Sequence, residues 1–443
     1  MTENLFRNDF KYYKQRVPAP SLDAVIDSRN PAHVAEHFME IHVENKDGDI
    51  PKNMNLKAKW RMFASKRNPG LILILDLFTP EQELYWAYTC LSLYTTSQYK
   101  RNFDGQLSVE NWFSRAKVDE GLVDKLRWST LGYHHNWDTK QYNDDDENNA
   151  DFPQDLAAVA KCIAEALRHQ RYKAEAAIVN FYPPSSTLSG HTDHSEHNLS
   201  APLISMSLGQ SAVFLLGGET TEQKPVPYLL TSGSVIVMDK SARLSYHAVP
   251  RIICDLDVDN RFIDLLNSSE LVLRIQQDSR IQQDSRIQQD SRIQQDSRIQ
   301  QDSRLQQDSR LQEESRLQEE SSIQQDSRIQ QDSRIQQDSR IQQDSRLHKE
   351  SRLQEESRIQ KESRIQQESR LQKESRLQDV FRNKIEQEKT KKTKQEDESI
   401  NKMNAENKNE ETINKLKIYE DLTFVKDYLR THRINLNIRQ VNF

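Results

Sequence analysis

The chain of 443 residues is poor in cysteine, and its three cysteines are scattered. Cys90, Cys162 and Cys254 form no CxxC pair, so the sequence indicates neither a disulfide framework nor a thiolate zinc site. Scarce, unpaired cysteine is typical of a protein in a reducing compartment.

Long apolar stretches and a secretory signal are also missing. No apolar run approaches about 18 residues, so we expect no membrane span. Near the N-terminus, Glu3 and Asp9 interrupt a set of basic residues that would otherwise resemble a transit peptide. We expect an intracellular protein, and the sequence does not distinguish nucleus, cytoplasm and mitochondrion.

The sequence has no overall basic charge. Residues 1–273 hold 28 Lys and Arg against 36 Asp and Glu, a balance of −8. Nucleic-acid binding would therefore need a local basic patch. Residues 50–70 are locally basic, although a short solvated loop has the same composition.

Apolar residues make up only 35% of the chain and charged residues 29%, so part of it is not packed core. The cause is a tandem repeat over residues 274–375, where 102 residues hold 17 copies of units such as Arg-Ile-Gln-Gln-Asp-Ser. A six-residue step turns an α-helix by about 600°, so successive Ile or Leu side chains point in three directions roughly 120° apart.

No apolar stripe results from this repeat, which disfavours a coiled coil, and the lack of glycine argues against a β-solenoid. We expect a fluctuating charged helix or disorder. Neutral expansion of repeated DNA and an arm that binds a protein partner both remain compatible with the repeat.

The residues with metal-binding chemistry lie between residues 177 and 251. His191 and Asp193 are two apart, and in an extended strand such side chains point to the same side and reach one ion. His247 follows on a later strand. Two imidazoles and one carboxylate suit a non-haem Fe(II) oxygenase, because the other coordination positions stay open for co-substrate and oxygen. A surface turn and an ordinary core histidine are the alternative interpretation.

A second pattern lies at the end of the chain. Residues 433–439 alternate strictly between polar and apolar, which predicts a half-buried strand with Arg433, Asn435, Asn437 and Arg439 on one face. Two arginines framing two asparagines suit a dicarboxylate pocket, because guanidinium pairs with carboxylate through two parallel hydrogen bonds. A polar face exposed to water would alternate in the same way.

Together these patterns resemble the AlkB family of Fe(II)/2-oxoglutarate dioxygenases. The resemblance rests on Asn180-x-Tyr182, His191-x-Asp193, His247 and Arg433-x-Asn435-x-x-x-Arg439. Stretches similar to the AlkB homologue 1 branch span residues 125–137, 202–218 and 428–433. The resemblance covers most of residues 1–253 and again residues 416–443.

The resemblance implies an enzyme that uses Fe(II), 2-oxoglutarate and O2 to demethylate or hydroxylate methylated bases in nucleic acid, either tRNA or DNA. His191, Asp193 and His247 would hold the iron. The residues that would bind 2-oxoglutarate are Asn180, Tyr182, Arg433, Asn435 and Arg439. Arg433 and the Tyr182 hydroxyl would bind the distal carboxylate, Asn180 would lie near the keto-acid end, and Arg439 would lie near Asp193 on the metal side of the pocket. Tyr133 and Trp137 would belong to a lid that stacks on the substrate base.

Short apolar runs separated by turn residues predict a strand that ends in residues 180–182 and strands over residues 202–209, 212–217, 228–230 and 234–238. A strand over residues 70–78, a helix beginning at Thr79-Pro80 and an amphipathic helix over residues 155–170 precede them. With the metal motif, this pattern predicts a mainly β fold with flanking helices and a double-stranded β-helix, or jelly-roll, core.

We expect five segments along the chain. They are an N-terminal arm (1–70), helical support with a nucleotide-recognition lid (71–175), the first part of the core (176–253), an insertion (254–415), and a return helix with the final core strand (416–443). Loop-closure entropy rises slowly enough with length to permit such an insertion.

Two other functions remain open. A protein hydroxylase would use the same iron site under a different lid. A binding or scaffold protein would use the repeat as its working part and carry a decayed oxygenase site. Because all three iron ligands and both arginines are present, the sequence favours the enzyme.

Overall fold

The computed structural model describes residues 3–42, 50–143, 145–254, 262, 265, 270–277 and 412–443. The chain divides into a unit formed by Met1–Gln276 and Asn414–Phe443 and a second unit over Gln277–Ile413. The second unit is almost entirely outside the described residues. The predictions for the repeat over 274–375, beyond its first four residues, and for most of the insertion over 254–415 therefore lie outside the described part of the chain.

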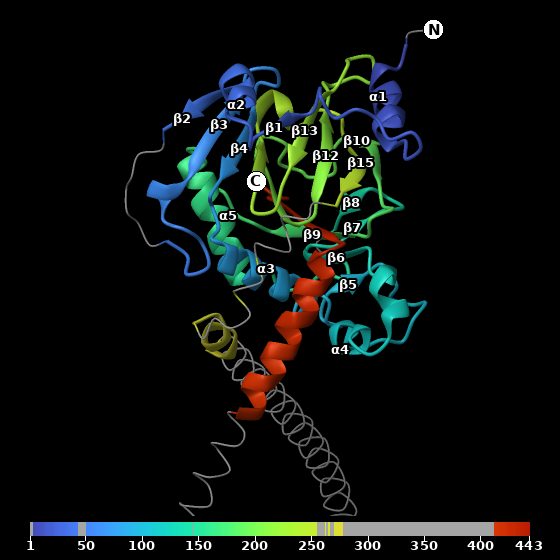
Figure 1. The fold of residues 1–443 in the computed structure, drawn as a ribbon, viewed down its shortest axis with the longest axis vertical. Helices are drawn as coiled ribbons and strands as arrows, with labels where there is room; N and C mark the ends of the chain where they lie inside the picture. Colours follow the sequence, from blue (N-terminus) through green and yellow to red (C-terminus); the bar gives the residue numbers. More distant parts are fainter. Residues whose placement is uncertain are drawn as a thin grey trace, which may run out of the picture. The chain divides into compact units, whose positions relative to one another are not determined.

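The described residues form two large β-sheets (Figure 1). In spatial order, the nine-stranded sheet contains β2 (Phe38–Ile41), β3 (Arg61–Ser65), β4 (Leu71–Leu75), β14 (Val235–Met238), β11 (Leu203–Gly209), β16 (Arg433–Arg439), β9 (Ala176–Tyr182), β6 (Trp128–Gly132) and β5 (Lys100–Arg101). The five-stranded sheet contains β1 (Ile26–Asp27), β13 (Val226–Leu230), β12 (Ser211–Leu216), β15 (His247–Ile253) and β10 (Leu188–His191).

A separate hairpin pairs β7 (His135–Asn136) with β8 (Gln141–Tyr142). The helices are α1 (Leu5–Lys14), α2 (Pro31–His37), α3 (Pro80–Ser92), α4 (Trp112–Ala116), α5 (Gln154–Ala166), a helix over residues 270–277 and a helix over residues 412–429. Short 3-10 turns lie at Lys57–Lys59, Glu120–Lys125 and Lys240–Ala242. None of the described helices is both long and apolar enough to span a membrane.

Part of the segment expected to form an N-terminal arm, residues 1–70, joins the two sheets. β1 pairs in parallel with β13, and β2 and β3 extend the large sheet beyond β4. Phe38 and Phe63 are buried with side chains from both sheets. These strands are only two to five residues long, so their sequences carry too little alternation to reveal them.

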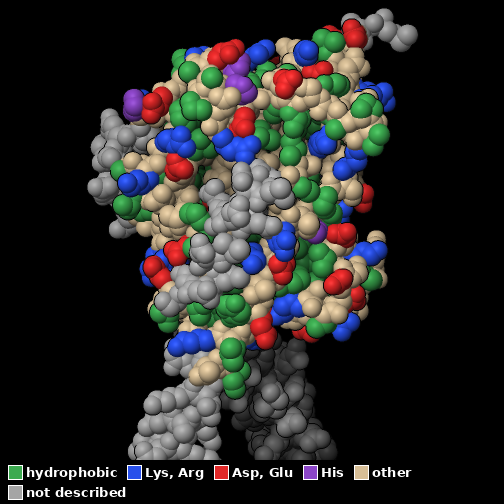
Figure 2. All heavy atoms as spheres, viewed as in Figure 1, with side chains coloured by type: hydrophobic (Ala, Val, Ile, Leu, Met, Phe, Trp, Pro, Cys, Tyr) green, Lys and Arg blue, Asp and Glu red, His purple; other side chains and the backbone are tan. Residues whose placement is uncertain are grey.

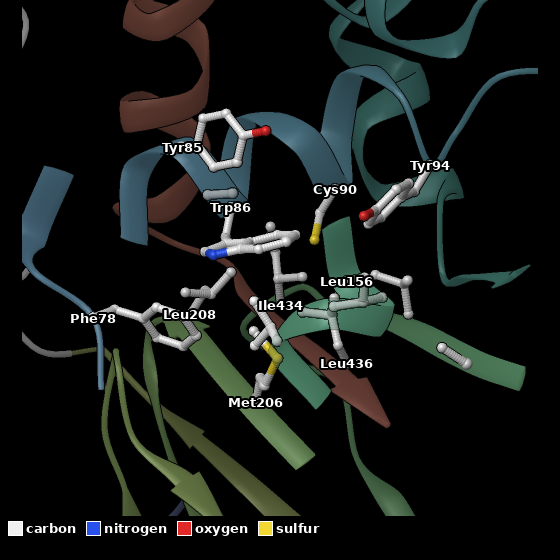
Figure 3. Close-up of a cluster of buried hydrophobic side chains, with 14 of the residues drawn as sticks. Phe78, Tyr85, Trp86, Cys90, Tyr94, Leu156, Met206, Leu208, Ile434 and Leu436 are labelled. Atoms are coloured by element: carbon white, nitrogen blue, oxygen red, sulfur yellow. The ribbon is translucent and has the colours of Figure 1, made fainter. Parts of the chain in front are cut away.

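The helix expected at Thr79-Pro80 is confirmed as α3. The Thr79 hydroxyl accepts a hydrogen bond from the Gln82 backbone N–H, and the Gln82 side chain accepts one from the Thr79 backbone N–H, which forms a capping box. One face of α3 buries Trp86 and Cys90 against the large sheet, where Met206 and Leu436 meet them (Figure 3). The amphipathic helix predicted over residues 155–170 is α5, which joins the same core.

The predicted final strand is also confirmed, and its position organises the large sheet. β16 lies between β11 and β9 and is antiparallel to both, with Asn435 opposite Asn180 and Ser207. Its apolar residues Ile434, Leu436 and Ile438 pack in the core with α3 and α5. The alternate polar side chains therefore face the space between the two sheets, where the candidate site lies.

On the outer side of the five-stranded sheet, which we call the small sheet, α1 packs against β15 and β10 (Figure 1). The Phe6 ring is buried between two glycines, and a Cβ built on Gly190 would lie 2.7 Å from Phe6 Cε1 and one on Gly217 2.9 Å from Phe6 Cδ2. Only glycine at these positions lets the ring approach the backbone so closely. Phe6 thus supports the strand that carries His191.

Acidic and basic side chains are interspersed on the face of the molecule in Figure 2. This distribution agrees with the nearly balanced composition of the chain. Any cationic surface of the protein must therefore be a local one.

Candidate metal centre and co-substrate cavity

The two histidines of the predicted metal site lie on neighbouring strands. His191 ends β10 and His247 begins β15, and the antiparallel register places them directly opposite each other. Their ring centroids are 4.3 Å apart. Two residues 56 positions apart in the sequence are thereby brought to the same edge of the five-stranded sheet.

Each imidazole is oriented by a backbone carbonyl. His191 Nδ1 lies 2.9 Å from the carbonyl oxygen of Ser189, and His247 Nδ1 lies 3.1 Å from that of Ser245. A carbonyl only accepts, so each Nδ1 carries the proton and each Nε2 presents a lone pair. Histidine ligands of metals are usually held in this way.

Both Nε2 atoms point toward Asp193, in the segment that follows β10. His191 Nε2 is 3.9 Å from Asp193 Oδ1, and His247 Nε2 is 3.6 Å from Asp193 Oδ2. One ligand atom from each of the three residues lies within 4.8 Å of the other two. The structure therefore brings together the three residues predicted to hold the iron.

Electrostatics keep this donor set in the form that a metal requires. Burial, with the neighbouring His191, lowers the pKa of His247 to about 4, so its ring is neutral near pH 7. Burial opposes ionisation of Asp193, but the Arg439 guanidinium and the two imidazoles outweigh it, and the pKa of Asp193 lies below its ordinary value. An anionic carboxylate beside two imidazoles fits Fe(II).

Buried arginines hold the Asp193 segment. Arg439 Nη2 lies 3.2 Å from Asp193 Oδ2, and Arg243 Nη1 donates to the backbone carbonyl of Asp193 at 2.7 Å. Glu196 joins these two arginines, because its Oε1 is 2.8 Å from Arg439 Nε and its Oε2 is 3.0 Å from Arg243 Nη2. The carboxylate ligand is thus supported through both its side chain and its backbone.

The candidate metal ligands His191, Asp193 and His247 line a cavity of about 380 Å³ between the two sheets. β9, β11, β14 and β16 supply one wall and β10, β12, β13 and β15 the other. All eight residues predicted to bind iron or 2-oxoglutarate line this cavity. They are Asn180, Tyr182, His191, Asp193, His247, Arg433, Asn435 and Arg439.

Arg433 is a buried cation that faces the cavity without an anionic partner among the described residues. Its side chain is 1% exposed. Its Nη atoms donate to the carbonyls of Gln210 and Leu230 and to the Ser207 hydroxyl, whereas Nε has no acceptor in the described part of the chain. Burial lowers its pKa to about 10, which leaves it charged near pH 7.

The Tyr182 hydroxyl is also buried and has no hydrogen-bond partner among the described residues. Tyr182 pairs with Arg433 across β9 and β16. A buried cation without an anionic partner raises the free energy of the folded state unless a ligand neutralises it. The same holds for a buried hydroxyl without a hydrogen-bond partner. A carboxylate satisfies both, which fits the predicted distal carboxylate of 2-oxoglutarate.

The other predicted co-substrate residues are placed differently. Arg439 is committed to Asp193 and Glu196, so its contacts are with a metal-ligand candidate rather than with open space. The Asn435 side chain donates to Ser205 Oγ and the Met206 carbonyl and accepts from Asn437. Asn180 lines the cavity opposite Asn435 on β9.

The two predicted substrate residues are not brought together at the cavity. Trp137, 43% exposed, lines it and stacks on Trp128 with a centroid distance of 4.1 Å. Tyr133 instead packs with Tyr142, Ala176 and Val441 and does not line the cavity. Trp137 lies instead in the turn between β7 and β8.

This geometry can be compared with known proteins. The chain matches the model of the 2OG-Fe(II) oxygenase superfamily over residues 70–281. It is 35% identical over 277 residues to the nucleic acid dioxygenase ALKBH1 of Mus musculus, which covers 57% of this chain and 70% of the mouse protein. This chain belongs to the AlkB family, in its ALKBH1 branch.

One further relative and one solved structure are also similar to this chain. The tRNA demethylase abh1 of Schizosaccharomyces pombe is 33% identical over 276 residues, covering 56% of this chain and 85% of the yeast protein. The solved structure of OsALKBH1 aligns with a TM-score of 0.30 and 21% identity, over 42% of this chain and 86% of that chain. Members of the 2OG-Fe(II) superfamily use Fe(II), 2-oxoglutarate and O2, and the His191, Asp193 and His247 set fits the iron.

Glu196 and Arg243 belong to this oxygenase site but were not predicted from the sequence. A charged residue in a loop has the same sequence signal whether it is solvated or buried. Only the folded chain shows that both side chains are almost fully buried and paired. No sequence pattern near Arg243 distinguishes it from an exposed arginine.

Proposed function

We propose that this enzyme oxidatively demethylates, or hydroxylates, methylated bases in nucleic acid, with tRNA and DNA as the substrate classes. The observation that supports it most strongly is that two oriented histidines and Asp193 share one cavity with Arg433 and Tyr182. Among the described residues, Arg433 has no anionic partner and the Tyr182 hydroxyl has no hydrogen-bond partner. That cavity holds a metal-binding end and a carboxylate-binding end.

Each part of the cavity has a role in this proposal. His191, Asp193 and His247 hold Fe(II), which, together with 2-oxoglutarate and O2, supplies the oxidising power for C–H hydroxylation. Arg433 and Tyr182 bind the distal carboxylate of 2-oxoglutarate and orient the co-substrate toward the metal ligands.

The overall reaction balances as follows. 2-Oxoglutarate loses CO2 and becomes succinate, one oxygen atom of O2 enters succinate, and the other converts an N-methyl C–H bond into C–OH. The resulting hemiaminal then breaks its C–N bond, releases formaldehyde and leaves a proton on the base nitrogen.

The aromatic side of the cavity supports a flat substrate. Trp128 and Trp137 stack on each other, and both line the cavity together with His135. Enzymes that act on a base take it out of the helical stack and hold it against aromatic side chains. The names of the mouse and yeast relatives, a nucleic acid dioxygenase and a tRNA demethylase, agree with such a substrate.

The fold that we propose for the catalytic unit is a double-stranded β-helix, or jelly roll, interrupted after β15 by the insertion over residues 254–415. Its support is the pair of sheets around the cavity and the position of β16, which follows the insertion yet lies between β11 and β9. The final strand then supplies Arg433 to the same cavity as His247.

The test is formaldehyde release from methylated oligonucleotides. The purified full chain with Fe(II), 2-oxoglutarate and ascorbate is incubated with single-stranded RNA and DNA that carry methylated adenine or cytosine, and with unmethylated copies. Formaldehyde and succinate should form in equal amounts, and only with the methylated strands.

Asp193→Ala should abolish both products, whereas Asp145→Ala, at an exposed carboxylate, should retain them. Succinate formation that no methylated strand stimulates, with no formaldehyde, would favour a protein hydroxylase. Failure of the wild type to form succinate at all would favour the binding or scaffold protein.

A further inference from the structure

A second hollow of about 670 Å³ lies at the end of α5, and we call it the α5 cleft. Its basic lining residues are Arg168, Arg171 and Lys173, which follow α5 along the chain. Asn198 and Ser200 line it from the segment after Asp193. No part of the proposed reaction uses these residues.

The acidic groups near the α5 cleft are already occupied. Glu175 Oε1 accepts from Lys173 at 3.0 Å, and its Oε2 accepts from the backbone N–H groups of Val441 and Asn442. Asp239 pairs with His169 at 3.1 Å and accepts from the Lys240 backbone. No carboxylate of these two residues is left to neutralise another cation.

Arg168 and Arg171 are exposed, and neither guanidinium makes an ion pair or hydrogen bond within the described part of the chain. Two free guanidinium groups three residues apart thus line one concave surface. Each offers a planar fork of donors that matches a phosphate group. The cleft is therefore a local cationic feature in a chain whose total charge is negative.

Arg168 also occupies a backbone position that favours glycine. Its φ is +71°, in the left-handed region. The Arg168 N–H donates to the Glu165 carbonyl and the His169 N–H to the Ala164 carbonyl, both at 2.9 Å, which is the hydrogen-bond pattern of a Schellman helix end with Arg168 at C′. A side chain at this position costs about 1 kcal/mol relative to glycine.

The helix dipole does not explain this choice of residue. A cation near the C-terminus of a helix stabilises it by about 0.3–1 kcal/mol, but a cation in the last turn of α5 would have the same effect without the left-handed backbone. Residues kept in such a conformation often serve a function that offsets the strain. Ligand binding by the Arg168 side chain is such a function.

The α5 cleft and the catalytic cavity have two chain segments in common. Residues 193–196 line the cavity, and residues 198 and 200–202 line the cleft. Arg439 lines the cavity, and its neighbour Gln440 lines the cleft. A ligand in the cleft therefore lies beside the segments that form the catalytic wall.

We propose that the α5 cleft binds backbone phosphates of the nucleic-acid substrate through Arg168 and Arg171. This inference rests on the proposed function, because it takes nucleic acid as the substrate. Phosphate contacts of this kind position the strand and raise affinity without reading its sequence.

The experiment measures binding of a fluorescently labelled, methylated single strand to the full chain by anisotropy over a range of salt concentrations. The variants are Arg168→Gly, Arg171→Gln and the double variant, and the matched control is Arg115→Gln, at an exposed arginine in the last turn of α4. Thermal unfolding of each variant is measured in parallel.

The double variant should bind roughly tenfold more weakly, and its plot of log affinity against log salt should be less steep by about 1 for each arginine removed. Arg168→Gly separates binding from folding, since glycine relieves the left-handed position. Its melting temperature should equal or exceed that of the wild type while its affinity falls.

The proposal is overturned if the double variant keeps the wild-type affinity and salt slope, or if Arg115→Gln weakens binding as much. Formaldehyde release by the wild type distinguishes a failure of the cleft assignment from a failure of the proposed function. If the wild type demethylates the strand while the double variant binds it normally, the cleft assignment alone fails. If the wild type neither binds nor demethylates any methylated strand, the proposed function fails as well.

Discussion

Arg243 donates a hydrogen bond from Nη1 to the backbone carbonyl of Asp193 at 2.7 Å, although the two residues are 50 positions apart. The same guanidinium contacts Glu196 and the Ala201 carbonyl. Arg243 thus holds both ends of the segment that carries the carboxylate ligand. It touches neither the metal ligand atoms nor the cavity, so it is a positioning residue.

Replacing Arg243 should weaken metal binding. Arg243→Gln removes the fork that holds Asp193 and leaves Glu196 with Arg439 as its remaining cation. We expect the affinity for Mn(II), measured by electron paramagnetic resonance as a redox-inert substitute for Fe(II), to fall by about 10- to 100-fold. The free energy of unfolding should fall by about 3 kcal/mol, because a buried ion pair is broken.

Arg243→Lys is the matched variant, since it keeps the charge but not the planar fork. It should recover most of the stability and only part of the metal affinity. An Arg243→Gln protein that unfolds more easily yet binds Mn(II) as tightly as the wild type would show that Arg243 is structural only.

Removing a proposed ligand should abolish metal binding itself. His247→Ala deletes an imidazole whose Nε2 faces Asp193, and the remaining histidine and carboxylate cannot complete the three-residue set. The Mn(II) signal of bound metal should disappear, and the melting temperature should no longer rise when metal is added. Retention of a stoichiometric bound metal by this variant would exclude His247 as a ligand.

Arg433 and Tyr182 should determine the affinity for 2-oxoglutarate. Arg433→Lys loses the donor geometry in a fully buried position, and we expect the KM for 2-oxoglutarate to rise by about 10- to 100-fold. Tyr182→Phe removes one hydrogen bond to the charged carboxylate and should raise the KM for 2-oxoglutarate by about tenfold. The measurement is succinate formation against 2-oxoglutarate concentration.

Arg430→Lys, at a half-exposed arginine near Arg433 in the sequence, serves as the control and should leave this KM as it is. If Arg433→Lys changed the metal affinity but not the KM for 2-oxoglutarate, the carboxylate would have to bind elsewhere.

His134 should make stability depend on pH. Burial lowers its pKa below the ordinary value of 6.5, so the unfolded chain takes up a proton at a higher pH than the folded protein does. Its contribution to stability is therefore present above the unfolded pKa and is lost as the pH falls toward the folded value.

Urea unfolding of wild type and His134→Asn between about pH 7.5 and pH 5 tests this expectation. The wild type should lose more stability across this range than the variant, which has no imidazole at this position. Parallel stability curves would contradict the assignment.

Much of the fold could be predicted where a periodic pattern is long enough to identify a face. The strict alternation of residues 433–439 predicted β16 and its polar face, and the Thr79-Pro80 signal predicted the start of α3. The short strands β1, β2 and β3 could not be predicted, because two to five residues carry little periodicity. The partner of β1, the strand β13, is also distant in the sequence.

For the site, the sequence by itself determined the chemistry of the donors: two histidines, one carboxylate and a strand with two arginines. Only the tertiary structure decided which of those two arginines has a charged partner among the described residues. β16 places Arg439 beside Asp193, 246 residues away, where its charge is paired, and Arg433 beside Tyr182, where its charge is not. Local pattern cannot distinguish the two, because charge pairing depends on which strands lie side by side and on which side chains lose their water.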